Sequence, residues 1–145
     1  MAKINLAPLT TIHYTTTIPV SVSHLNYGNH LGHDALVSIL HEARVRFLAS
    51  LGYSELKIED AGLILRDLTV QYKAEAFYGD ELQISIEVAQ LSSCGFELHY
   101  QVDKAGTTQI VARAQTTMVC FDYATHKIMK LPGSFARQFA NQTPQ

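Results

Sequence analysis

The sequence has 145 residues, 47% of them hydrophobic and 17% charged, and a formal net charge of -2. A chain of this length and composition buries a core large enough to fold without disulfides or a structural metal, so we expect one domain over residues 1–145. With 11 basic and 13 acidic residues and no long block of like charge, the sequence predicts no nucleic-acid-binding surface.

Membrane attachment and secretion are not predicted either. No stretch approaches the roughly 20 consecutive apolar residues of a membrane-spanning helix, and the first residues lack the charged and apolar regions of a signal peptide. The two cysteines, Cys94 and Cys120, fit a reducing compartment and core packing better than a disulfide or a nucleophile. We therefore expect a cytoplasmic protein.

The first regular element is a strand over residues 12–22. Apolar side chains fall there on alternate positions from Ile12 to Val22, which indicates one buried face, and Pro19 indicates a sheet edge or a bulge. Residues 23–30 break the alternation with Asn, Gly and His and are predicted to form a loop. This loop holds the densest set of polar functional groups in the chain.

A helix is predicted from Leu31 to Leu51, because apolar residues recur there at helical spacing, and Gly52 is placed to cap its end. The apolar stripe consists of Leu36, Leu40, Ala43, Phe47 and Leu51, widened by Val37, Ile39 and Leu48. The opposite face carries His41, Glu42, Val45 and Arg46. We expect that mixed face to contact a second subunit.

Four stretches in the second half alternate apolar and polar residues and are predicted strands: residues 68–73, 82–88, 96–103 and 109–121. The turns between them are too short for parallel crossovers, so they predict an antiparallel meander. A short helix over 135–139 follows Pro132–Ser134. This order predicts an α+β fold in which one long central helix is wrapped by a curved antiparallel sheet of about five strands.

Two segments carry a family resemblance. Residues 26–35 read Asn-Tyr-Gly-Asn-His-Leu-Gly-His-Asp-Ala, and residues 41–44 read His-Glu-Ala-Arg. They resemble the Asp-x-x-Gly-His-Val-Asn-Asn and Glu-Ala-Arg segments of the hydroxybenzoyl-CoA thioesterase branch of the hot-dog acyl-CoA thioesterases. Tyr72, Gly79–Asp80 and Phe121–Asp122 stand at further family positions, so the resemblance covers nearly the whole chain.

The resemblance implies the hot-dog fold and the hydrolysis of acyl-CoA or acyl-carrier-protein thioesters to a carboxylic acid and a free thiol. It implies no cofactor and no metal, and a homodimer whose pairing into a homotetramer stays open. The family's catalytic Asp falls on Asn26, which cannot act as a carboxylate nucleophile or general base. The similar plant acyl-carrier-protein thioesterases place Asp, Asn, His and Glu at offsets that fall on Asn26, Gly28, His30 and Glu42.

Thioester hydrolysis needs water made reactive by a base and a donor that stabilises the oxyanion. By resemblance, the donor is the backbone N–H of His33, at a helix N-terminus that favours negative charge. His30 is a candidate base, because imidazole titrates near neutral pH. The alternative is a loop histidine that only fixes the turn.

Two carboxylates are further candidates. Asp34 could replace the missing Asp as a base or simply favour the helix start. Glu42 could face a cleft formed with a second subunit or simply pair with Arg46, four residues on. Asn26 would then orient water or substrate through its amide.

Three other functions are weighed against the thioesterase. A catalytically silent acyl-thioester binding protein would explain Asn26. A hot-dog hydratase or dehydratase is disfavoured because the chain lacks a His-Phe-Pro segment. A metal site of HD-type phosphohydrolases, with His24, His30, His33, His41 and Asp34, is disfavoured because those proteins are all-helical.

The basic residues Arg66, Lys73 and Arg113 fit surface charge better than coenzyme contacts.

Overall fold

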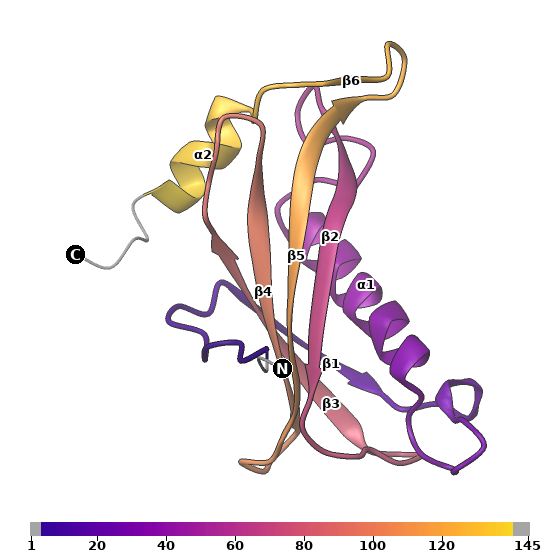
Figure 1. Ribbon diagram of the computed structural model, residues 1–145. Coiled ribbons are helices and arrows are strands. Elements are labelled where there is room, and N and C mark those ends of the chain that lie inside the picture. Colours follow the sequence, from indigo (N-terminus) through magenta and orange to yellow (C-terminus); the bar gives the residue numbers. More distant parts are fainter. Residues whose placement is uncertain (1–3, 141–145) are drawn as a thin grey trace.

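One antiparallel sheet and one long helix make up most of the computed structural model, which describes residues 4–140. The elements are β1 (Tyr14–Pro19), the 3-10 helix η1 (Val22–His24), α1 (His33–Ser50), β2 (Gly62–Tyr72), β3 (Glu81–Ala89), β4 (Gly95–Lys104), β5 (Ile110–Asp122), β6 (Lys127–Ile128) and α2 (Gly133–Ala140). The strands lie in the order β1-β3-β4-β5-β2, with β6 paired to β5. Helix α1 runs along one face of the sheet (Figure 1), which confirms the predicted α+β arrangement.

The prediction of a meander is correct for β3, β4 and β5 but wrong for β2. Strand β2 pairs with β5 at the far edge of the sheet rather than with β3. The connection over residues 73–80 therefore crosses three strand spacings, or about 14 Å. Eight extended residues reach roughly 26 Å, so a short connection does not require adjacent strands in a curved sheet.

Strand boundaries differ from the predictions where the alternation is interrupted. Strand β1 is shorter than predicted, and both Ile12 and Val22, which were expected on its buried face, are exposed. Its position at the sheet edge confirms what Pro19 indicated. Strand β2 begins at Gly62 rather than near residue 68, because a register shift between Leu65 and Asp67 breaks its alternation.

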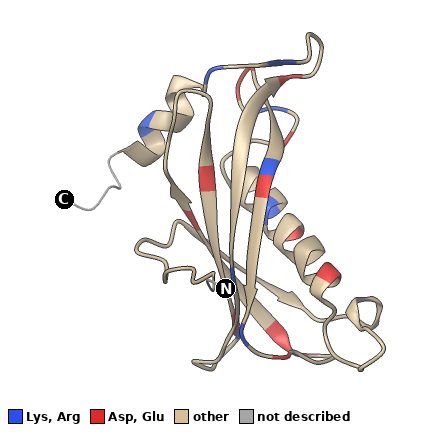
Figure 2. Cartoon of the chain, viewed as in Figure 1, with Lys and Arg blue, Asp and Glu red and all other residues tan. Residues whose placement is uncertain are grey.

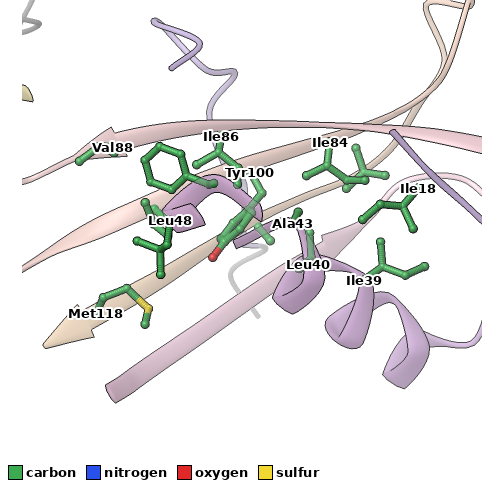
Figure 3. Packing of buried hydrophobic residues seen from close by; sticks show 14 of the residues in the cluster. Ile18, Ile39, Leu40, Ala43, Leu48, Ile84, Ile86, Val88, Tyr100 and Met118 are labelled. Carbon is green, nitrogen blue, oxygen red and sulfur yellow. The ribbon is translucent and has the colours of Figure 1, made fainter. Parts of the chain in front are cut away.

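The predicted apolar stripe of α1 forms the core. Leu36, Leu40, Ala43 and Phe47 are fully buried, together with Ile39 and Leu48. In Figure 3, side chains of this helix point toward Ile84, Ile86 and Tyr100 of the sheet. Gly52 follows the helix in the left-handed region, with φ of 82°, as expected of a residue that ends a helix.

The C-terminal helix α2 closes one end of this core. Phe135 stacks on Phe96 of β4, with ring centroids 4.5 Å apart, and Phe139 packs against Phe47 of α1. Burial raises the pKa of the Cys120 thiol to about 11, which agrees with the expected core packing. Within residues 4–140, neither helix is both long and apolar enough to span a bilayer.

Candidate active site

Backbone pairing fixes the polar loop in front of α1. The Asn26 N–H donates to the His30 carbonyl at 3.0 Å, and the Leu31 N–H donates to the carbonyl of Ala76 at 2.8 Å. A further antiparallel bridge joins His30 to Phe77. The loop therefore packs against residues 74–77, which follow β2, at the end of the molecule where α1 begins (Figure 1).

A cavity of about 380 Å³ lies where these segments meet. It is lined by Asn26, His30, Leu31, His33, Tyr72, Lys73, Ala74 and Glu75. Three predicted site residues, Asn26, His30 and His33, are thus brought together. The other polar residues come from the end of β2 and the chain after it, and nothing in the sequence spacing predicted them at this cavity.

The orientation of His30 engages one ring nitrogen in a hydrogen bond and leaves the other able to accept a proton. Its Nδ1 lies 3.2 Å from the carbonyl oxygen of Leu31, and because a carbonyl only accepts, this contact assigns the proton to Nδ1. The Nε2 lone pair then remains available, with the nearest carboxylate oxygen of Glu75 at 3.8 Å. Asn26 uses its side-chain oxygen within the loop, accepting the Gly28 N–H at 2.9 Å.

The start of α1 offers donors to the same cavity. The N-cap residue is Gly32, which has no side chain that could cap the helix. The first backbone N–H groups of α1 therefore keep their hydrogen-bonding capacity. The Tyr72 hydroxyl donates to the carbonyl of His33 at 2.7 Å. Burial, and to a smaller extent the charge of Asp34, raise the pKa of Tyr72, so the hydroxyl stays a donor at neutral pH.

The remaining predicted carboxylates lie outside the lining of this cavity. Asp34 is in the first turn of α1, close enough to Tyr72 to act on it electrostatically. Glu42 lines a different cavity, of about 440 Å³, together with residues of β1 and η1. Its Oε2 accepts from Arg46 Nε at 2.8 Å, which is the pair that the spacing predicted. Within one chain, Glu42 does not meet His30.

Comparison with known proteins identifies the family of this chain. A family model described as the thioesterase-like superfamily matches residues 20–139. The chain belongs to the thioesterase-like superfamily. It is 33% identical over 102 residues to the 1,4-dihydroxy-2-naphthoyl-CoA hydrolase of Microcystis aeruginosa, covering 68% of this chain and 72% of that protein.

Two further similarities extend over more of the chain. The long-chain acyl-CoA thioesterase FadM of Escherichia coli is 27% identical over 119 residues, which are 81% of this chain and 90% of that protein. The solved structure of a 1,4-dihydroxy-2-naphthoyl-CoA thioesterase from Synechocystis matches with a TM-score of 0.79 at 24% identity. That match covers 90% of this chain and 98% of the other. The expected hot-dog fold and the expected enzyme class, a thioester hydrolase, are thereby confirmed.

The residues considered for a metal do not converge as the phosphohydrolase alternative requires. Within residues 4–140, no three His, Cys, Asp or Glu side chains gather in a way that could hold a metal ion. His24 accepts the Ser21 N–H through Nδ1, and the His41 ring lies 2.6 Å from Glu55. The two histidines are therefore engaged with different partners, away from His30.

Charged residues are scattered over the elements rather than collected on one of them (Figure 2). Arg66 pairs with the neighbouring Asp67, and Arg113 donates to Gln101. Lys73 is different, because it lines the same cavity as His30. Of the three basic residues considered for coenzyme contacts, Lys73 therefore lies at the candidate site.

We expect Tyr72→Phe to lower kcat by roughly tenfold while the fold is retained, because a misplacement of reacting groups by about 1 Å can cost about 10²-fold in rate. The substitution removes the hydrogen bond that holds the first carbonyl of α1. Tyr123→Phe is the matched control, since the Tyr123 hydroxyl also donates to a backbone carbonyl at 2.7 Å, that of Leu63, away from the cavity. Steady-state thioester hydrolysis measures both, and equal kcat values for the two variants would contradict the role of Tyr72.

Proposed function

We propose that this protein hydrolyses acyl-CoA thioesters in the cavity at the N-terminus of α1. Its named relatives act on a dihydroxynaphthoyl-CoA and on long-chain acyl-CoA. The observation that carries the proposal is the placement of the His30 ring and the first residue of α1 on one cavity. A base and an oxyanion donor are the two groups that water-driven thioester hydrolysis requires.

In the proposed reaction, His30 Nε2 takes a proton from water as the water oxygen bonds to the thioester carbon. The carbonyl electrons move onto oxygen, where the backbone N–H of His33 and the positive end of the α1 dipole stabilise the charge. The carbonyl then re-forms, the carbon–sulfur bond breaks, and the departing sulfur takes the proton from Nε2. The products are a carboxylic acid and a free thiol, and no cofactor takes part.

Asn26 and Asp34 are assigned supporting roles in this proposal. Asn26 has an amide that orients water or the acyl group without changing protonation state. Asp34 adds to the effect of burial in raising the pKa of Tyr72, and the Tyr72 hydroxyl holds the start of the helix. Neither residue is required to accept the proton from water.

The proposed working unit is a cytoplasmic homodimer of one domain per chain, with a homotetramer left open. The α1 face that carries His41, Glu42 and Val45 is exposed in the single chain. The edge strand β2 also exposes Leu65 and Leu68. A second copy that covers these surfaces would bring Glu42 toward a site between subunits, which is one of the two roles that the sequence left open for it.

One observation keeps a second function in view. Asn26 occupies the position of the family's catalytic Asp, so the cavity could bind acyl thioesters without hydrolysing them. The two functions share the pocket and differ only in turnover.

A thiol-release assay on the purified protein separates them. The substrates are aromatic, short-chain and long-chain acyl-CoA, each paired with the same acyl group on acyl carrier protein. We expect turnover well above a heat-inactivated control with at least one acyl-CoA. Saturable binding without thiol release across the panel would establish the binding protein instead.

A further inference from the structure

We infer that Glu75 supplies the carboxylate that Asn26 cannot, and that it acts through His30. The inference rests on the proposed function, since it concerns the base of that reaction. Glu75 lies in the connection between β2 and β3, far along the chain from Asn26. The structure nevertheless places both residues on one cavity.

The backbone around Glu75 is held against the polar loop in front of α1. The neighbouring Ala76 is fully buried and accepts the Leu31 N–H at 2.8 Å. On its other side, Phe77 forms a bridge with His30 and donates its N–H to the Asp80 carboxylate at 2.9 Å. Glu75 therefore starts from a fixed position beside the ring, although its own side chain is largely exposed.

The carboxylate faces the nitrogen that takes the proton. Glu75 Oε1 is 3.8 Å from His30 Nε2, while Nδ1 is occupied by the Leu31 carbonyl. Among residues 4–140, no other carboxylate forms an ion pair with His30. Lys73 shares the cavity lining but makes no ion pair with Glu75 in this described range, so the charge of Glu75 is not neutralised there.

Two groups beside the His30 ring have different roles in the proposed proton transfer. The Leu31 carbonyl fixes the tautomer, and the Glu75 carboxylate stabilises the imidazolium that forms when Nε2 accepts a proton from water. That charge exists between attack on the thioester carbon and proton transfer to the departing sulfur. Because the interaction is stronger there than in the ground state, it affects kcat more than KM. Glu75 is thus a positioning residue that acts through His30, 3.8 Å away, and takes no proton itself.

The test compares Glu75→Gln with Glu97→Gln. The first removes the carboxylate beside His30 and keeps the size of the side chain. The second removes a carboxylate 2.8 Å from another histidine, His99, and both of these residues lie on β4 outside the lining of the cavity. We expect Glu75→Gln to lower kcat roughly tenfold or more, as part of the 10²- to 10⁴-fold supplied by a positioned base. KM should change by less than about twofold, because the lost interaction is stronger in the transition state than in the ground state. Glu97→Gln should leave both constants unchanged.

Two further variants separate charge from structure. Glu75→Asp should retain part of the activity, and Glu75→Ala should regain activity when formate is added, because a small carboxylate can occupy the vacated space beside Nε2. Glu75→Gln with the kcat of the wild type overturns this inference and leaves the proposed function standing. A wild-type protein that releases no thiol from any substrate overturns both.

Discussion

We expect His30→Asn to lower kcat by roughly 10²- to 10⁴-fold, the range that a positioned general base contributes. Asparagine keeps a polar group that reaches about as far as Nδ1, but it cannot take a proton from water at neutral pH. His30 is half-buried, and among residues 4–140 its ring makes one hydrogen bond, to the Leu31 carbonyl. The change in unfolding free energy should therefore be small, about 1 kcal/mol.

His126→Asn is the control for this variant. His126 lies in the turn between β5 and β6, is exposed, and has a φ of 57° that asparagine tolerates. It lies outside the lining of the cavity. Steady-state kinetics of the two variants, with urea unfolding beside them, isolates the proton acceptor. Full activity in a folded His30→Asn protein would remove His30 from the mechanism.

A large effect on stability is expected at Arg44, the last residue of the Glu-Ala-Arg segment. Its side chain is only 7% exposed, lies 3.5 Å from Glu55, and donates to the Tyr100 hydroxyl at 3.3 Å. Tyr100 in turn contacts Thr116 at 2.8 Å. Arg44 therefore ties α1 to β4, β5 and the segment after the helix. Arg44→Ala should lower the free energy of unfolding by about 3 kcal/mol, through lost packing and lost pairing.

Arg44→Met shows which of these two losses matters more. Methionine fills much of the same space without the charge, and the buried Nε of Arg44 has no hydrogen-bond partner among residues 4–140. The guanidinium is thus desolvated and incompletely paired, so its charge contributes little net stability. We expect a loss of about 1 kcal/mol and unchanged kcat, measured by urea unfolding and thiol release. A loss equal to that of Arg44→Ala would mean that the charge, not the packing, stabilises this contact.

Much of the fold could be predicted because it depends on local pattern. The stripe of α1, the glycine that follows it and the edge position of Pro19 are each set by a few neighbouring residues. The pairing of β2 with β5 was missed because it is non-local, and the early start of β2 was hidden by the irregularity between Leu65 and Asp67. The length of a short connection limits the distance between two consecutive strands, but it does not determine which strand the second one pairs with.

In the candidate site too, the residues that are close in sequence could be predicted and those brought together by non-local pairing could not. Asn26, His30 and His33 fall within eight consecutive positions, so one segment and its family resemblance were enough to bring them together. Tyr72 and Glu75 reach the cavity only through the pairing of residues 74–77 with the loop in front of α1, which no spacing in the sequence reveals. For Glu42, the spacing predicted its partner Arg46, whereas its proposed role in the site requires a second chain.

The most direct measurement follows the amide and imidazole NMR signals of the protein on adding an acyl-CoA analogue whose thioester sulfur is replaced by a methylene group. The analogue cannot be hydrolysed but keeps the carbonyl. We expect the largest shifts at the His33 amide, the His30 ring and the residues around Tyr72. An unmoved His33 amide, with shifts confined to Ser38, Ile39 and Glu42 of the other cavity, would contradict hydrolysis at the N-terminus of α1.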